Sequence, residues 1–256
     1  MEPIESSFEI QILHQEGECL VVLKPGGLLT QAPPGIESME SLVRRYFRQE
    51  NNVPITDSVY VGMPHRLDRP ASGVMLFGQT KKTTRKLAQQ FEKRTVKKTY
   101  WALIEGRPEE DGGAWSDHMR KIPGQPQSEI VSPDASDAQE ARLVCQVIAS
   151  DTHISLLEIQ LETGRTHQIR LQTSSRGMPI VGDAQYGSGL EFGPATVDQR
   201  KRWIALHARS LDFWHPQLHR PVIVTADLPE CWRQFPTEIP LARLCQERRG
   251  ENPKLS

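Results

Sequence analysis

The stretch His65-Arg66-Leu67-Asp68-Arg69-Pro70-Ala71-Ser72-Gly73 runs directly into the apolar sequence VMLF at 74–77, and it decides the fold of this chain. Pro70 and Gly73 favour tight turns, and the apolar run after them has the length of a buried strand. The stretch therefore predicts a compact loop that presents Asp68 at one end of a strand.

The charge pattern around Asp68 makes it a candidate catalytic group. Arg66 and Arg69 flank it, and opposite charges within about 4 to 6 Å favour the ionised form of a carboxyl group. An ionised aspartate can serve as a nucleophile or a general base. Taken alone, an aspartate in such a loop is more typical of a structural salt bridge or a turn cap than of a catalytic group.

Strand patterns dominate on both sides of this loop. Apolar runs predict strands at 8–13, 19–23, 73–77, 99–104, 141–148, 154–161, 205–213 and 221–225. The short connection at 149–153 predicts an antiparallel hairpin. Helical spacing predicts helices over 39–49, after Ser38, and over 81–93, where Thr80 can act as the cap. Segments rich in Pro, Gly, Ser and acids predict loops at 31–36, 108–113, 122–137 and 185–196. Periodicity alone thus indicates a strand-rich α+β fold.

A second polar stretch, Thr163-Gly164-Arg165-Thr166-His167-Gln168-Ile169-Arg170, also favours a functional site. Gly164 allows a tight turn, Thr166 is a candidate helix cap, and Arg170 would then lie in the second turn. So many hydrogen-bond donors beside a helix start suit an anion or phosphate site better than simple packing.

Composition limits the class of protein. A chain of 256 residues that is 37% hydrophobic can bury one sizeable core but is short for two full domains. We expect one domain over 1–245 and a polar tail over 246–256. The four cysteines have no short pair spacing, so neither a zinc knuckle nor a disulfide framework is expected. No stretch approaches the roughly 18 apolar residues of a membrane span, and a cytoplasmic monomer is expected.

Positive charge is concentrated in one region although the formal net charge is −1. Residues 81–98 carry eight basic side chains and a single acid, Glu92. On the predicted helix, Lys82, Lys86 and Lys93 should point outward as candidate contacts to an RNA backbone. The alternative is a helix face that is merely solvated.

Together these segments resemble the RluA family of pseudouridine synthases. The stretch VVLKPGGL at 21–28 resembles the first motif of that family, HRLDRPASG its catalytic motif, and KKTYWAL at 97–103 the strand that bears its active-site tyrosine. LETGRTHQIR at 161–170 resembles its arginine motif, and the resemblance continues through PIVGDAQYG to about residue 229. It implies a pseudouridine synthase catalytic fold, in which a mixed, largely antiparallel sheet with flanking helices holds a central cleft.

The resemblance also implies residue roles. Asp68 matches the essential aspartate, Tyr100 the ring that stacks on the target uracil, and Arg170 the arginine paired with the aspartate. Arg66 matches an arginine that helps hold the nucleotide out of the RNA stack. Arg165 and His167 lie in the arginine motif and are candidate substrate-binding residues.

The implied reaction isomerises uridine in ribosomal or transfer RNA, and neither cofactor nor metal is expected for it. The residues do not decide whether Asp68 attacks C1′ or C6 or removes a sugar proton to give a glycal. Two rivals stay open at this level: an RNA-folding protein whose modifying activity is dispensable, and a nucleoside hydrolase. The second is weaker because glycosidases usually pair two carboxyl groups.

Overall fold

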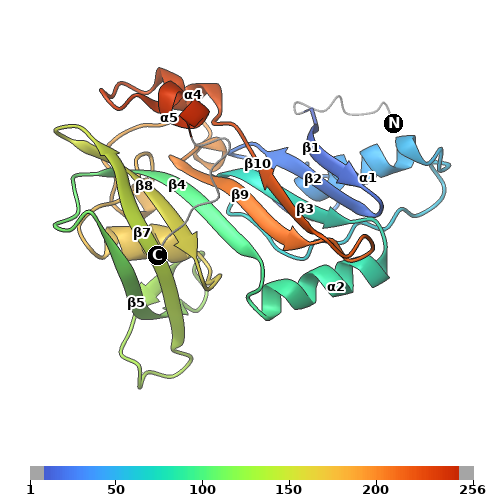
Figure 1. Cartoon of the computed structure of the whole chain (residues 1–256), viewed down its shortest axis with the longest axis horizontal. Coiled ribbons are helices and arrows are strands. Elements are labelled where there is room, and N and C mark those ends of the chain that lie inside the picture. The colour runs from blue at the N-terminus through green and yellow to red at the C-terminus, as the bar shows by residue number, and fades with distance from the viewer. Residues whose placement is uncertain (1–8, 248–256) are drawn as a thin grey trace.

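In the computed structural model, which describes residues 9–247, ten strands form one sheet (Figure 1). The strands are β1 (Gln11–Glu16), β2 (Cys19–Lys24), β3 (Ser72–Gly78), β4 (Lys97–Glu105), β5 (Gly112–Lys121), β6 (Ser128–Ile130), β7 (Gln139–Ser150), β8 (Ile154–Leu161), β9 (Leu206–Trp214) and β10 (Pro221–Thr225). The α-helices are α1 (Met39–Glu50), α2 (Lys81–Glu92), α3 (Gln168–Ser174), α4 (Glu230–Gln234) and α5 (Leu241–Glu247), and short 3-10 turns occupy Ala184–Tyr186 and Gln199–Lys201. The predicted α+β fold with a largely antiparallel sheet is confirmed.

The strand order places a late part of the chain in the middle of the sheet. The order is β1-β2-β3-β9-β4-β8-β7-β5-β6, and β10 also pairs with β9. The pairing of β3 with β9 is parallel, whereas the other described pairs are antiparallel. Gly73 makes the close approach possible, because its φ is +127° and an added Cβ would lie 2.4 Å from backbone atoms of Ala208. β9 thereby brings the end of the Asp68-bearing loop beside β4.

Alternation along β3 explains why helices cover both faces of this half of the sheet. Val74 and Leu76 pack with Leu87 of α2, whereas Met75 and Phe77 pack in another cluster with α1. Both helices begin as predicted: Ser38 forms a capping box with Ser41, and the Thr80 side chain accepts the N–H of Thr83.

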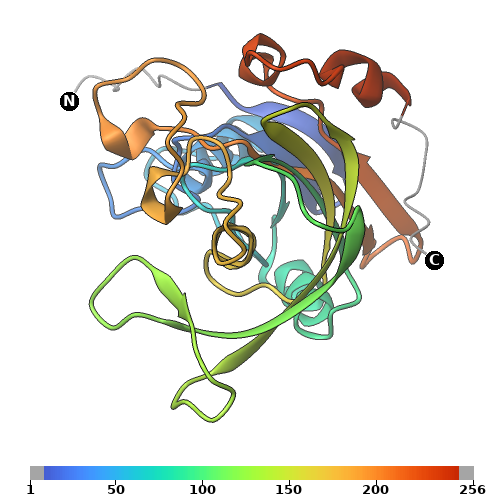
Figure 2. The ribbon, with the colours of Figure 1, turned by 90° about the vertical axis from the view of Figure 1, so that its left-hand side faces the viewer.

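The other half of the sheet curves around α3, as Figure 2 shows. The predicted hairpin is formed by β7 and β8. Two expected loops were partly wrong, because 108–113 contains the start of β5 and 122–137 contains β6. Both strands lie at the exposed end of the sheet, where β5 is held by pairing with β7 rather than by a regular apolar pattern.

The remaining predictions about the chain ends and cysteines have mixed outcomes. The strand predicted at 8–13 is observed as β1, shifted toward Glu16, and Phe8 lies outside the described residues. Positions 246 and 247 of the predicted tail belong to α5, and 248–256 lie outside the description. All four cysteines are free thiols. Among residues 9–247, no helix has the length and apolar character needed to cross a bilayer.

Candidate active site

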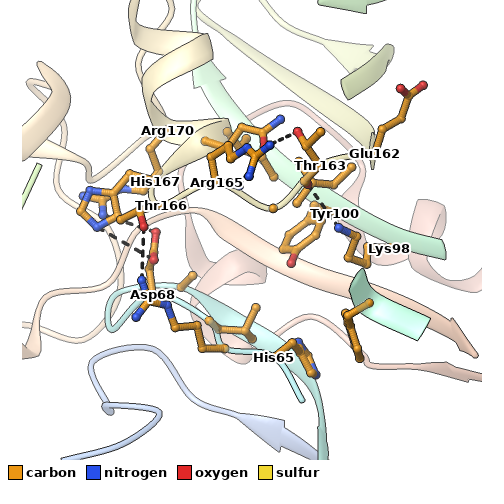
Figure 3. A pocket seen from close by; sticks show the side chains of 18 of the residues that line it. His65, Asp68, Lys98, Tyr100, Glu162, Thr163, Arg165, Thr166, His167 and Arg170 are labelled. Atoms are coloured by element: carbon orange, nitrogen blue, oxygen red, sulfur yellow. Dashed lines mark hydrogen bonds and ion pairs between the residues drawn. The ribbon is translucent and has the colours of Figure 1, made fainter. Parts of the chain in front are cut away.

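A cleft of about 490 Å³ opens where the two halves of the sheet meet. Its walls come from the loop 65–71, hereafter the Asp68 loop, from the start of β4, and from the turn that leads into α3 (Figure 3). Asp68, Tyr100 and Arg170, which are far apart in sequence, all line this cleft. The expectation that the fold brings these three side chains together is therefore met.

Two buried side chains hold the Asp68 loop from beneath. The Thr30 hydroxyl donates to the Leu67 carbonyl at 2.8 Å and accepts the N–H of the same residue at 3.2 Å. On the other side of Asp68, the Lys24 ammonium donates to the carbonyls of Arg69 at 3.1 Å and Ala71 at 2.7 Å. The backbone on both sides of the carboxylate is thus fixed by side chains from outside the loop.

Lys24 is a fully buried charge beneath that carboxylate. A third bond from its ammonium reaches the Pro25 carbonyl at 2.9 Å, so three acceptors match the three donors of a protonated lysine. Burial lowers the pKa of Lys24 to about 7, and the negative charge of Asp68 opposes that shift. Asp68 therefore stabilises the charged form of Lys24.

Arg170 is the cation nearest to Asp68, and a third residue fixes its orientation. Its Nη1 lies 3.6 Å from Asp68 Oδ2. Its Nε and Nη2 donate to the two carboxylate oxygens of Asp183 at 2.6 and 2.7 Å, and Nη2 also donates to Gln185 at 2.7 Å. Arg170 and Asp183 are 3% and 1% exposed, so this is a buried bidentate pair. Asp183 holds the guanidinium while leaving Nη1 directed at Asp68.

The start of α3 differs from the prediction. The cap position is His167, in the left-handed conformation with φ +58° and without a side-chain cap bond, so Arg170 lies in the first turn rather than the second. Thr166 does not cap the helix, because its hydroxyl instead bonds to the Arg66 guanidinium at 3.2 Å. The left-handed turn directs His167 Nε2 toward Asp68 Oδ1, 3.9 Å away. Its Nδ1 bonds to the hydroxyl of Tyr186 at 2.9 Å, and burial lowers the pKa of His167, which favours the neutral ring at pH 7.

The two arginines beside Asp68 in sequence do not supply its ion pair. Among the described residues, the ion pair of Asp68 is with Arg170, His167 Nε2 lies 3.9 Å from its carboxylate, and the Arg66 guanidinium turns across the cleft to Thr166. Arg165 lines the cleft, but its Nε donates to the carbonyl of Glu140 at 2.9 Å. The flanking arginines correctly predicted that Asp68 would lie beside a cation, but that cation is Arg170 and not Arg66 or Arg69.

Tyr100 forms the floor of the cleft. Its side chain is 9% exposed and packs in the main core cluster, while its ring faces the open space (Figure 3). Burial, helped by the negative charge of Asp68, raises the pKa of the Tyr100 phenol. The phenol thus stays neutral at ordinary pH and offers an apolar face for stacking.

The predicted basic face of α2 is only partly available. Lys82 and Lys93 are exposed, as expected. Lys86 does not point freely outward, because its ammonium donates to the Pro216 carbonyl at 3.0 Å. No group of three or more His, Cys, Asp or Glu side chains in the described part of the chain is arranged to hold a metal ion.

Comparison with known proteins identifies the family. A family model described as RNA pseudouridylate synthase matches residues 18–175, well over half of the chain. This chain belongs to the RNA pseudouridylate synthase family. It is an RNA pseudouridine synthase of the RluA type, an isomerase, and the matched residues include Asp68, Tyr100 and Arg170.

Individual relatives of this synthase extend over almost its whole length. The tRNA pseudouridine synthase C of Salmonella typhi is 30% identical over 245 residues, an alignment that covers 90% of each chain. The dual-specificity RNA pseudouridine synthase RluA of Vibrio vulnificus is 30% identical over 222 residues, which cover 85% of this chain and 83% of that one. The solved structure of human RNA pseudouridylate synthase domain containing 4 superposes with a TM-score of 0.68 at 24% identity, covering 86% of this chain and 88% of its own, and so shares the fold.

Three site residues had no assigned role in the sequence. Asp183 lies inside the PIVGDAQYG segment and Lys24 inside the first motif, but nothing local shows that one binds Arg170 and the other supports the Asp68 loop. Lys98 lies both in the basic run and in the KKTYWAL segment, and neither pattern assigns it a role. The position of Lys98 two residues before Tyr100 could have predicted that it lines the cleft, because residues two apart on a strand share a face.

Proposed function

We propose that this synthase converts specific uridines of structured ribosomal or transfer RNA to pseudouridine, with Asp68 as its catalytic carboxylate. The observation that carries the proposal is the convergence of Asp68, the buried Arg170 and the Tyr100 ring on one cleft. The volume of that cleft falls within the range of about 300 to 1,000 Å³ usual for ligand pockets. The names of relatives that act on transfer RNA or have dual RNA specificity support this substrate class.

The proposed chemistry rearranges bonds without any net gain or loss of atoms. The bond between uracil N1 and C1′ breaks, the base turns within the cleft, and C5 bonds to C1′. The proton on C5 is then lost, and N1, no longer bound to the sugar, carries a proton in the product. Asp68 either forms a transient bond to the substrate or removes a sugar proton, and both routes need an ionised carboxylate.

The other cleft residues are assigned supporting roles. Arg170, held by Asp183, would orient Asp68 and limit the rotation of its carboxylate. Tyr100 would stack on the extruded uracil, a contact that contributes about 1 to 3 kcal/mol per base. Arg66 would leave Thr166 to fill the space vacated in the RNA stack, since a base must leave its helix before its glycosidic bond can react. Arg165 and His167 would contact the bound nucleotide.

Asp68→Asn provides the test. The amide has nearly the same shape but cannot act as nucleophile or base, so pseudouridine formation should fall by at least about a thousandfold. Carbodiimide primer extension on total RNA, with and without the gene, would identify the substrate and measure this loss. Glu162→Gln is the matched control, because Glu162 also lines the cleft but is bound by Arg142 at 3.1 Å. Undiminished product from Asp68→Asn would overturn the proposal.

A cytoplasmic location and a monomeric state stay predictions, since no described feature tests them. The non-modifying RNA-folding role is less well supported than catalysis, because the Asp68 and Arg170 side chains are positioned for chemistry that such a role does not require.

A further inference from the structure

The far wall of the cleft carries two cations, Arg94 and Lys98. Lys98 lies on β4 two residues before Tyr100, so both side chains point into the cleft, and Figure 3 shows Lys98 and Asp68 on different sides of the Tyr100 ring. Lys97, on the opposite face of the strand, is exposed and lies 3.9 Å from the carboxylate of Asp212. Lys97 thus lies beside a carboxylate at the surface, whereas Lys98 faces the cleft.

Arg94 reaches the cleft through an uncommon backbone conformation. It follows the C-cap of α2 with φ +57°, a left-handed position at which helices usually end on glycine. Its N–H bonds to the Phe91 carbonyl at 3.1 Å, and the Phe91 ring stacks on His65 of the Asp68 loop with centroids 4.5 Å apart. The end of α2 is therefore anchored to the Asp68 loop. Arg94 extends from this end although its left-handed backbone conformation favours glycine.

The two cations have no counter-charge among residues 9–247. In the described part of the chain, neither has an ion pair with a carboxylate. Burial, together with the positive charge of Arg94, lowers the pKa of Lys98 to about 8, and no described carboxylate opposes that shift. Glu92 and Glu162 also line the cleft, but Glu92 is exposed and Glu162 is bound by Arg142. Folding alone gains nothing from placing two like charges together.

The Lys98 ammonium has more hydrogen-bond donors than the described residues satisfy. One of its three hydrogens is directed to the Thr163 carbonyl at 3.2 Å, and the others have no described acceptor. An ammonium and a guanidinium side by side match the oxygens of a phosphodiester, which carries one negative charge and flanks every nucleotide on both sides.

We propose that Arg94 and Lys98 form a phosphate clamp that grips the RNA backbone next to the target uridine. This inference rests on the proposed function, because a uracil stacked on Tyr100 would bring one of its flanking phosphates to this wall. The clamp holds the backbone in place while the base is extruded, so it acts in substrate binding rather than in bond rearrangement.

The test compares Arg94→Gln and Lys98→Gln with Lys97→Gln, the matched control on the opposite face of β4. All three are made in the Asp68→Asn protein so that bound RNA is not converted, and binding to a mixed transfer RNA preparation is titrated against salt. Each clamp variant should bind about tenfold more weakly and lose about 0.7 to 0.9 from the slope of log affinity against log salt, the value of one phosphate contact. Lys97→Gln should leave the slope unchanged.

Two further measurements exclude a merely structural role. Melting temperatures of the clamp variants should lie within about 4 °C of the parent, because no ion pair of the described residues is lost and Lys98 gives up one hydrogen bond, to the Thr163 carbonyl. Lys98→Arg should restore the slope, because it keeps the charge. Weaker binding with an unaltered slope, or no change in binding at all, would overturn the clamp.

Failure of the clamp differs visibly from failure of the proposed function. If the wild-type protein forms no pseudouridine in any RNA but the clamp variants still lose slope, the proposed function fails and the clamp stands. If pseudouridine is formed and the slopes of both clamp variants equal that of Lys97→Gln, the clamp fails and the proposed function stands.

Discussion

The two walls of the cleft hold charge in opposite ways. On the wall that carries α3, Arg170 and Asp183 form a buried bidentate pair, and Asp68 lies 3.6 Å from the same guanidinium. On the wall at the end of α2, Arg94 and Lys98 both line the cleft, and neither forms an ion pair with a carboxylate of residues 9–247. We infer from this difference that the paired charges of Arg170 and Asp183 fix the geometry of the site, whereas the charges of Arg94 and Lys98 are available to bind a ligand. Mutations should therefore change stability on the paired wall and RNA binding on the unpaired wall.

Asp183→Ala should have the largest effect on folding. It leaves the Arg170 guanidinium buried without its main partner, which typically costs about 3 to 5 kcal/mol of unfolding free energy. Urea denaturation measures this loss, and activity should fall as Arg170 loses its orientation.

The double variant Arg170→Met/Asp183→Leu sharpens this contrast. Replacing both members of a buried pair by apolar side chains often restores stability. The double variant should therefore unfold at nearly the parental urea concentration and yet form no pseudouridine. If Asp183→Ala is as stable as the parent, the pair does not organise this wall.

On the unpaired wall, the affinity of the wild-type protein for RNA should fall by about five- to tenfold between pH 7.5 and 9. The pKa of Lys98 is about 8 in the free protein, so its charge is present below that value and lost above it. A bound phosphate favours the charged form, hence the complex gives up affinity as the free lysine loses its proton. Fluorescence anisotropy with labelled transfer RNA at constant salt would measure the effect.

Lys98→Arg is the control for this pH profile, because a guanidinium keeps its charge throughout the range. Two neighbouring groups do not change charge there: burial raises the pKa of Tyr100, which stays neutral, and burial lowers the pKa of His65 to about 3. A profile that is the same in Lys98→Arg and wild type would assign the titration to another group, such as Lys24, rather than to the clamp.

The smallest effect is expected outside the cleft, on the exposed face of α2. Lys82→Gln and Lys93→Gln should each lower the salt slope by less than about 0.4, because exposed cations contact the RNA through screened, long-range attraction. Lys86→Gln should act on stability instead, through loss of its bond to Pro216. A slope change for Lys82 or Lys93 as large as that for Lys98 would mean that RNA lies along the helix face.

Local signals explain which elements could be predicted. α1 and α2 were placed within one residue at each end, because Ser38 and Thr80 cap them and their apolar residues have helical spacing. β5 and β6 were missed because they begin in or lie within segments rich in Gly, Pro and polar residues, and they become strands through the pairing of β5 with β7 and of β6 with β5. Strand pairing between distant segments has no signature within either segment.

The candidate site shows the same limit. The resemblance pointed to Asp68, Tyr100 and Arg170, and all three line the cleft. It could not show that Thr166 would serve Arg66 rather than cap α3, or that Asp183 would hold Arg170 from 13 positions away. These hydrogen bonds depend on the tertiary positions of the segments before and after α3, which the local sequence does not reveal.

The central place of β9 has a consequence for the synthesis of the protein. β3 and β4 leave the ribosome long before β9, which pairs with both of them and ends at Trp214. Until then each of these apolar strands has an unpaired edge, a condition that invites association with other chains. The nascent chain cannot complete its cleft until β9 has been translated, so the apolar edges of β3 and β4 stay open to other chains until that point.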